Sequence, residues 1–142
     1  MYNWLKRNGY APAFDHAGIY QITIDGIIVY IGKSRNMMWR LAKHNARIKY
    51  PDNHKYRILA EAKRKGHNVR FEAIYDAKST NYLDMVEEIG ANEGYFIRKH
   101  RPPLNEQIPK EGDWHRFDVN PRAREITLEE IMREGAANGN DS

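Results

Sequence analysis

The chain has 142 residues, of which 41% are hydrophobic and 11% aromatic, so it can form one domain with a buried core. It contains no cysteine, which excludes disulfides and thiolate metal sites and leaves oxygen or imidazole ligands for any metal. No apolar run approaches the roughly 20 residues of a membrane span, and the N-terminal MYNWLKRNGY lacks the apolar core of a signal peptide. We therefore expect a soluble, cytoplasmic protein without a membrane partner.

Positive charge is concentrated in parts of the chain, although the formal net charge is only +4. Between Arg35 and Arg70 only Asp52 and Glu61 oppose the many basic residues, and a second basic cluster, RKHR, spans residues 98–101. A charge cluster is often no more than a solvated face, but clusters of one sign and this size favour nucleic acid as partner. The residues that we expect to contact it are Arg35, Lys43, Arg47, Lys49, Lys55, Arg57, Arg98 and Arg101.

The first predicted element is a β-hairpin. The runs GIYQITI (18–24) and IIVYIG (27–32) are rich in β-branched and aromatic residues, and Asp25-Gly26 between them favours a tight type I′ turn. A core alone could use Val or Ile where the two strands carry Tyr20 and Tyr30. These tyrosines are therefore candidates for function.

Two helices and a third strand are expected next. NMMWRLAKHNARIKY (36–50) predicts a helix capped by Asn36, and HKYRILAEAKRKG (54–66) predicts a second helix that closes at Gly66. NVRFEAIYDA (68–77) alternates as a strand does. The helical periodicity of the first helix predicts a buried side of Met37, Met38, Leu41, Ala42 and Ile48 and an open side of Arg40, Lys43, His44 and Arg47.

The remaining elements are a long helix and a C-terminal extension. The long helix runs from Asn81 to His100 and stops before Pro102-Pro103, after which LNEQIP (104–109) is expected to be a loop. EGDWHRFDVNPRARE (111–125) is expected to be irregular, and TLEEIMRE (127–134) to be a short helix opened by a capping box at Thr127 and Glu130. GAANGNDS (135–142) is expected to be a frayed tail. We divide the chain into a core, 1–110, and an extension, 111–142.

Glu93 is the most informative residue of the long helix. It projects from the middle of an apolar stripe formed by Tyr82, Met85, Val86, Ile89, Phe96 and Ile97. An ionised carboxylate on a buried face is costly unless it is paired or binds metal. An ion pair with Arg or Lys would satisfy Glu93, and so would a hard cation at the edge of the core.

Arg40 and His44 lie one helical turn apart, so their side chains are expected to emerge together. A guanidinium can hold two phosphoryl oxygens and an imidazole can transfer a proton, although two solvated helix residues would give the same spacing. The sequence YIGKS (30–34) lacks the first glycine of a P-loop, which excludes that ATP-binding motif. Lys33 is instead expected to lower the pKa of the Tyr30 phenol and make a tyrosine a better general base.

Taken together, these residues resemble the GIY-YIG nuclease family. GIY (18–20), YIG (30–32), RLAKH (40–44), Glu93 within NEGYFIRKHRPPLN, and Asn105 at its end follow the family's order and approximate spacing. The resemblance covers Gly18 to Asn105. It implies an α/β (α+β) fold in which a small three-stranded antiparallel sheet is flanked by helices, with one site that cleaves phosphodiester bonds.

The resemblance also implies roles for the reacting groups. Tyr20 would accept a proton from the attacking water, and Tyr30 would contact the water or the scissile phosphate. Arg40 would stabilise the phosphoryl charge, and Glu93 would bind a single Mg²⁺ or Mn²⁺. The exposed face of the hairpin would then be the floor of the active site, with both phenol hydroxyls aimed at one phosphate.

Three further positions complete the implied site. Asn105 would help to hold it together, and His44 matches a position that some members use in proton transfer. Lys33 matches a lysine that tunes the tyrosine only in certain branches of the family.

The resulting hypothesis is a metal-dependent endonuclease that acts on DNA, with duplex as the expected form. The absence of cysteine excludes a zinc finger, and the length favours a stand-alone enzyme of the restriction or phage type. Oligomerisation would be a natural way for one such site to cut both strands. The alternatives are a catalytically silent nucleic-acid-binding module that keeps the fold, and a nuclease for RNA or branched DNA. Trp114, His115 and Arg116 would contact bases or pack the extension.

Overall fold

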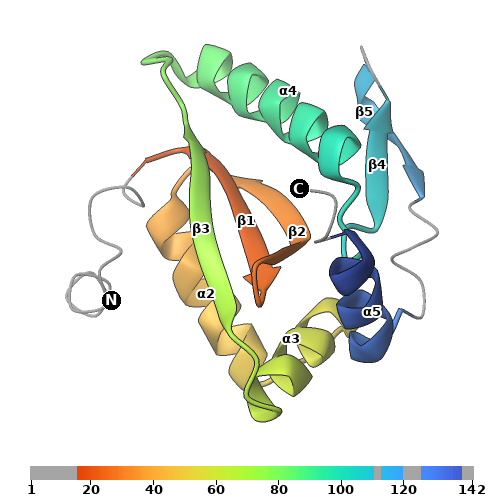
Figure 1. The fold of residues 1–142 in the computed structure, drawn as a ribbon. Helices are drawn as coiled ribbons and strands as arrows, with labels where there is room; N and C mark the ends of the chain where they lie inside the picture. The colour runs from red at the N-terminus through yellow and green to blue at the C-terminus, as the bar shows by residue number, and fades with distance from the viewer. Residues whose placement is uncertain (1–15, 111–112, 120–125, 139–142) are drawn as a thin grey trace.

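A three-stranded antiparallel sheet lies at the centre of the computed structural model, which describes residues 16–110, 113–119 and 126–138 (Figure 1). The strand order is β2-β1-β3. The strands are β1 (Gly18–Ile24), β2 (Ile27–Ser34) and β3 (Val69–Asp76). The helices around them are α2 (Met37–Lys49), α3 (His54–Arg64), α4 (Tyr82–His100) and α5 (Leu128–Asn138). The predicted fold class, a small antiparallel sheet flanked by helices, is confirmed.

The β1–β2 hairpin turns at Asp25 and Gly26, whose φ angles of 50° and 83° are those that a type I′ turn requires. Further along the hairpin, Ile22 pairs with Tyr30 but Thr23 pairs with Ile28, so Val29 is an extra residue in β2. This β-bulge lets Val29 and Tyr30 both contact the apolar cluster on the α2 side of the sheet. The bulge therefore sets the direction of Tyr30 on the edge strand.

Asparagine side chains cap the N-termini of α2, α3 and α4. Asn36 accepts a hydrogen bond from the Trp39 amide, Asn53 accepts one from the Tyr56 amide, and Asn81 caps α4. The α3 helix is followed by Gly66 at a φ of 87°, as its C-terminal glycine predicted. These helix boundaries are local properties, and the sequence predicts them to within two residues.

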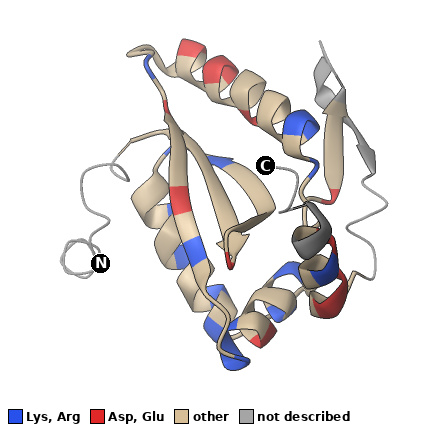
Figure 2. Ribbon diagram, in the orientation of Figure 1, with Lys and Arg blue, Asp and Glu red and all other residues tan. Residues whose placement is uncertain are grey.

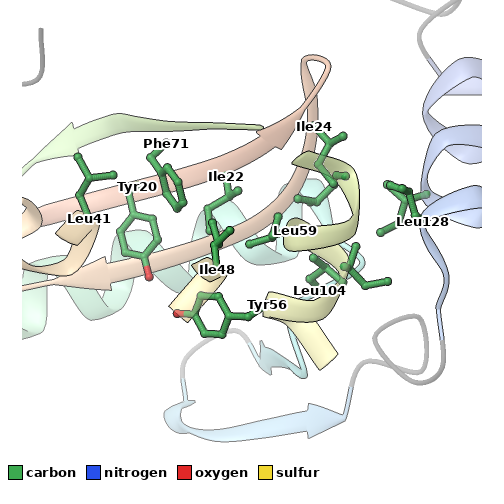
Figure 3. Close-up of a cluster of buried hydrophobic side chains, with 14 of the residues drawn as sticks. Tyr20, Ile22, Ile24, Leu41, Ile48, Tyr56, Leu59, Phe71, Leu104 and Leu128 are labelled. Atoms are coloured by element: carbon green, nitrogen blue, oxygen red, sulfur yellow. The ribbon is translucent and has the colours of Figure 1, made fainter. Parts of the chain in front are cut away.

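The sheet is buried on both faces. On one face, side chains of the hairpin pack against α2, α3 and α5, and Figure 3 shows Tyr20, Ile22, Leu59 and Leu128 among this cluster. On the other face, Ile19 and Ile31 pack against α4. The sheet is therefore the middle layer, with α2, α3 and α5 on one face and α4 on the other. Its edge strand β2 lies between α2 and α4.

The segment after α4 differs from its prediction as a loop. Strands β4 (Gln107–Lys110) and β5 (Asp113–Val119) form a second, two-stranded antiparallel sheet. The expectations of a loop at 104–109 and of irregular chain at 113–119 are therefore wrong for these strands. The two strands pair with each other, and Pro109 inside β4 hides the pattern because proline is rare in strands.

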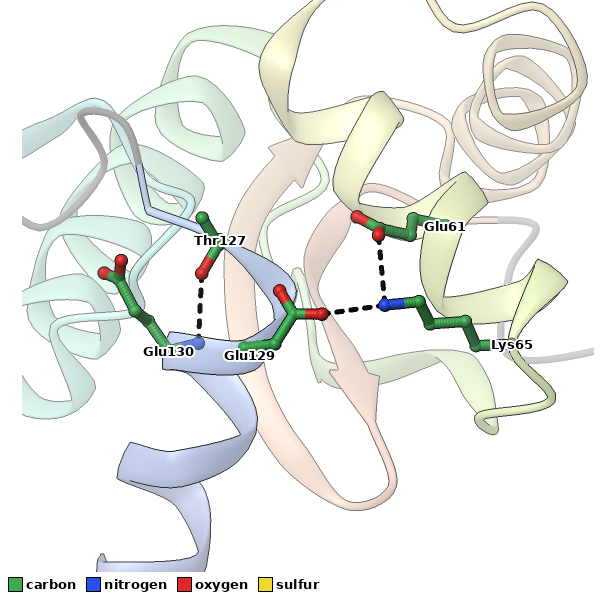
Figure 4. Close-up of polar contacts among 5 residues, drawn as sticks. All are labelled: Glu61, Lys65, Thr127, Glu129 and Glu130. Atoms are coloured by element: carbon green, nitrogen blue, oxygen red, sulfur yellow. Dashed lines mark hydrogen bonds and ion pairs between the residues drawn. The ribbon is translucent and has the colours of Figure 1, made fainter.

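The last helix, α5, packs against the core. The Glu130 amide donates to Thr127 Oγ1 at 3.2 Å, which confirms the predicted capping contact, and Lys65 of the α3 C-cap joins Glu61 and Glu129 (Figure 4). Ile131 is fully buried in the same cluster as Tyr20. The helix continues to Asn138, so the expected fraying is wrong for residues 135–138, whereas residues 139–142 lie outside the described part. None of the described helices has the length and apolar composition to cross a bilayer.

Candidate active site

Tyr20 and His44 lie in the core, between the sheet and α2. Only 5% of Tyr20 and 1% of His44 is exposed, and Tyr20 Oη lies 2.8 Å from His44 Nε2. The predictions that His44 projects from the open side of α2 and that Tyr20 lies on an exposed floor are therefore wrong. The imidazole stacks on Phe71 at a centroid distance of 5.3 Å, and two hydrogen bonds compensate for its burial.

Gly32 makes room for the Tyr20 ring. The two residues are paired across the β1–β2 ladder, and a Cβ at position 32 would lie 2.4 Å from Tyr20 Oη. A side chain at this position would push the phenol away from His44. Position 32, the last residue of YIG, is thus restricted to glycine by the ring of Tyr20, the last residue of GIY.

Tyr56 is the second partner of His44, and the sequence analysis did not single it out. Its hydroxyl lies 2.6 Å from His44 Nδ1, so the imidazole is held between two phenols. Burial, reinforced by the charges of nearby Lys and Arg side chains, lowers the pKa of His44 to about 3. The ring is therefore neutral and has one donor and one acceptor nitrogen, so one tyrosine donates to it while the other accepts from it.

The environment of the phenols opposes their ionisation. Burial raises the pKa of Tyr20 well above its usual range. Burial and the Glu93 charge raise the pKa of Tyr30 to about 12, although Arg40 acts in the opposite direction on both phenols. The prediction that Lys33 lowers the pKa of Tyr30 is therefore wrong. The Lys33 ammonium instead lies 4.0 Å from a carboxylate oxygen of Glu93.

Tyr30, Glu93 and Asn105 line one pocket of about 340 Å³ at the edge of β2. The Lys55 ammonium also lines this pocket and lies 3.9 Å from the centroid of the Tyr30 ring. Burial, with the charges of Arg47 and Arg40, lowers the pKa of Lys55 to about 8. The sequence analysis predicted Lys55 only as a nucleic-acid contact, and the structure places it beside the candidate reacting groups.

Asn105 binds the outer edge of β2. Its Oδ1 accepts from the Ile31 amide at 2.9 Å, and its Nδ2 donates to the Ile31 carbonyl at 2.7 Å. The neighbouring Leu104 amide donates to the Val29 carbonyl at 2.9 Å. A buried side-chain amide thus makes the two bonds that another strand would make. This contact fixes the segment after α4 against the strand that carries Tyr30.

Glu93 reaches the same pocket from the other side, on α4. Its side chain is 16% exposed, and burial raises the pKa of its carboxyl even though Lys33 and Arg40 lower it. Of the predicted apolar stripe, Ile89 and Ile97 are buried, but Tyr82 and Val86 are 55% and 38% exposed. The prediction of a buried apolar stripe is thus wrong for Tyr82 and Val86, in the first turns of α4.

The donor set at Glu93 suits a hard cation that keeps most of its waters. The described residues contain no group of three or more His, Cys, Asp or Glu poised to hold a metal. Glu93 nevertheless opens into a pocket that a second carboxylate, Glu106, also lines. The 4.0 Å separation from Lys33 is the limit of an ion pair and leaves the charge of this partly buried carboxylate incompletely balanced. Mg²⁺ prefers one or two carboxylates with several waters, and Glu93 and Glu106 are the carboxylates that line this pocket.

Arg40 is the cation common to the candidate groups, because its charge shifts the pKa of Tyr20, Tyr30, His44 and Glu93. Its Nε is buried and has no hydrogen-bond partner among the described residues. The side chain lines a second pocket, of about 220 Å³, formed by Lys33, Ser34, Arg35, Arg40, Tyr82, Val86 and Ile89.

Some of the predicted nucleic-acid contacts line one of the two pockets, and the others do not. Lys and Arg residues recur along α2 and α3 (Figure 2). The Lys43 side chain lies over the Trp39 ring, and that of Arg47 lies over the Tyr56 ring. Arg35 lines the second pocket. The predicted contacts that line neither pocket are Lys43, Arg47, Lys49, Arg57, Arg98 and Arg101. The side chains of Trp114, His115 and Arg116 lie outside the described part of the structure.

Comparison with known proteins gives a relative for this chain. No family model and no solved structure matches it. Endonuclease II of Enterobacteria phage T4 is 32% identical over 100 residues, which covers 65% of this chain and 74% of the relative. With nearly a third of the aligned residues identical over most of the relative's length, this chain belongs to the family of phage T4 endonuclease II.

Proposed function

We propose that this protein is a metal-dependent endonuclease that hydrolyses phosphodiester bonds in DNA with an active site of the GIY-YIG type. The relative named endonuclease II supports the reaction class. The observation that carries the proposal is the pocket at the edge of β2, where Tyr30, Glu93 and Asn105 meet. Three separate segments of the chain supply these residues, and Arg40 brings the cation that phosphoryl transfer requires.

Tyr20 and His44 act together as the base in this proposal. Because burial raises the pKa of Tyr20, its phenolate form is unavailable at neutral pH. As the Tyr20 oxygen takes a proton from the attacking water, its own proton passes to His44 Nε2, 2.8 Å away. The imidazolium donates through Nδ1–H to Tyr56. Because the pKa of His44 is low, the imidazolium does not persist, and its proton returns through Tyr20 to solvent.

The phosphate lies between Tyr30 and Arg40. The guanidinium of Arg40 donates to two phosphoryl oxygens, and its Nε, which has no partner among the described residues, is available as one of the donors. Glu93 would hold Mg²⁺ or Mn²⁺, which neutralises charge on the phosphoryl oxygens when bound. Asn105 keeps Tyr30 in place through Ile31.

Incubation with plasmid DNA in Mg²⁺, Mn²⁺ or EDTA tests this function. We expect nicked or linear products with either metal and none in EDTA, and gel electrophoresis measures them. DNA binding without cutting in any metal would contradict the proposal and favour the silent binding module. Cleavage of single-stranded RNA or branched DNA, with intact duplex, would replace the substrate by the alternative that the sequence analysis left open.

Tyr56→Phe tests the role of the second phenol. The change removes only the hydroxyl that fixes His44, so we expect kcat to fall roughly 10- to 100-fold with little change in DNA affinity. Cleavage rates and the ¹⁵N shifts of the His44 ring, which report its tautomer, are the measurements. Tyr50→Phe is the control, because Tyr50 is 73% exposed. An unchanged tautomer together with an unchanged rate would exclude this role for Tyr56.

A further inference from the structure

The pocket that Arg40 shares with Lys33 and Arg35, here called the Arg35 pocket, is strongly cationic. It opens where β2 ends, α2 begins and the first turns of α4 pass, and none of the described residues that line it is acidic. Three cations around a volume of about 220 Å³ make a site for an anion. The function proposed above uses only Arg40 from this pocket.

The cations of the Arg35 pocket are held in place without full neutralisation. Arg35 Nη1 donates to Tyr82 Oη, and its guanidinium lies 5.9 Å from the centroid of the Tyr82 ring. A phenol orients Arg35 but does not cancel its charge. The Lys33 ammonium lies 4.0 Å from Glu93, at the limit of an ion pair. The pocket therefore has donors and charge to offer a ligand.

An exposed indole stands beside these cations. Trp39, 46% exposed, precedes Arg40 in α2, and the Arg40 guanidinium lies 5.7 Å from its ring centroid. The Lys43 ammonium lies 4.3 Å from the same ring. Tyr82, 55% exposed, lines the pocket itself. A simple anion needs no aromatic surface, whereas a nucleotide has both an anionic phosphate and a base that stacks on aromatic rings.

Lys33 links the Arg35 pocket to the pocket of Glu93. It lines the first, and its ammonium lies 4.0 Å from the carboxylate that lines the second. A strand with one phosphate beside Glu93 and Arg40 can therefore place its next phosphate near Lys33 and Arg35.

We propose that the Arg35 pocket is a second nucleotide subsite, which binds the phosphodiester adjacent to the one cleaved and stacks the base of that nucleotide on Trp39. The inference rests on the proposed function, because it takes the Glu93 pocket as the place of cleavage. The ligand is a DNA strand with an unpaired base at this position. Arg35 contributes to affinity for any strand, whereas Trp39 contributes only when a base is present.

Binding in EDTA separates this subsite from catalysis. Fluorescence anisotropy with a labelled single-stranded DNA, and with an abasic strand of the same length, gives Kd for each variant. We expect Arg35→Gln to weaken binding of both strands about 5- to 10-fold. Trp39→Ala should weaken binding of the strand with bases by about 5- to 100-fold and leave the abasic strand unchanged.

Matched controls use residues away from the pocket. Tyr50→Ala removes another exposed aromatic next to a lysine, since Lys49 lies 5.7 Å from its ring, and Lys63→Gln removes an exposed cation from α3. Arg35→Gln and Trp39→Ala variants that match these controls would overturn the subsite, even if plasmid DNA is cut. An effect of Trp39→Ala that is equal on the abasic strand would overturn base stacking. Measured with an RNA strand of the same length as a further probe, substitutions that weaken RNA binding but not DNA binding would overturn the DNA ligand. The expected binding losses in a protein that cuts no plasmid would support the nucleotide site and contradict the proposed function.

Discussion

Glu93→Gln is expected to lower the rate of metal-dependent cleavage by about 10³-fold or more. The substitution keeps the size of the side chain but replaces the anionic oxygen that a hard cation requires with a neutral amide. DNA binding should be unchanged or tighter, because Lys33 and Arg40 lose the carboxylate that opposes their charge. Loss of cleavage with retained binding would identify Glu93 as a group of the reaction.

Plasmid nicking in Mg²⁺ and Mn²⁺, with gel-shift binding in EDTA, measures both parts of this prediction. Glu87→Gln, an exposed change six residues earlier on α4, is the control and should cut at the wild-type rate. Glu106→Gln tests the other carboxylate of the same pocket. Cleavage by Glu93→Gln within about tenfold of wild type would remove Glu93 as the metal ligand, and a larger loss in Glu106→Gln would transfer that role.

Asn105→Ala should destabilise the protein by about 2–5 kcal/mol. Asn105 is 6% exposed, and its loss leaves the amide and the carbonyl of Ile31 without their partner. Each unpaired buried group costs about 1–3 kcal/mol. Urea unfolding followed by circular dichroism measures the change, and Gln107→Ala, at an exposed position two residues later, is the control. Equal stability of the two variants would contradict the role of Asn105 as the clamp on β2.

Asn105→Asp adds a pH dependence that alanine lacks. Its carboxylate can accept from the Ile31 amide but faces the Ile31 carbonyl, whereas the protonated acid can donate to that carbonyl. Burial and the carbonyl should raise the folded-state pKa of the new carboxyl above its unfolded value. Its stabilising contribution is then present below the unfolded pKa and is lost as the pH rises through the folded pKa. Unfolding curves at several pH values test this sign.

The sequence predicts the parts of the fold that depend on neighbours in the chain. The turn at Asp25-Gly26 and the cap at Asn36 require only local hydrogen bonds and backbone angles, and the structure has both. The pairing of β4 with β5 is different, because neither strand carries a pattern that identifies its partner.

The candidate site shows the same limit. His44 is spaced with the buried residues Leu41 and Ile48 on α2, but its polarity suggests a solvated position. Tyr20 and Tyr56 from two other elements satisfy both nitrogens and permit burial. The position of Tyr56 depends on how α3 packs against α2, which periodicity does not contain. The pKa of Tyr30 rises because burial and the Glu93 charge outweigh the opposing Arg40 charge, and burial is a property of the assembled fold.

The contacts of residues 104 and 105 with β2 also affect how copies of this protein can meet. An edge strand normally presents unpaired amides and carbonyls on which another chain can add a strand. Here the Val29 carbonyl and both polar groups of Ile31 already have partners. The outer edge of β2 is thus closed at its middle against strand addition. A second copy cannot extend the sheet there, so strand addition to this sheet would have to use β3, the other edge strand.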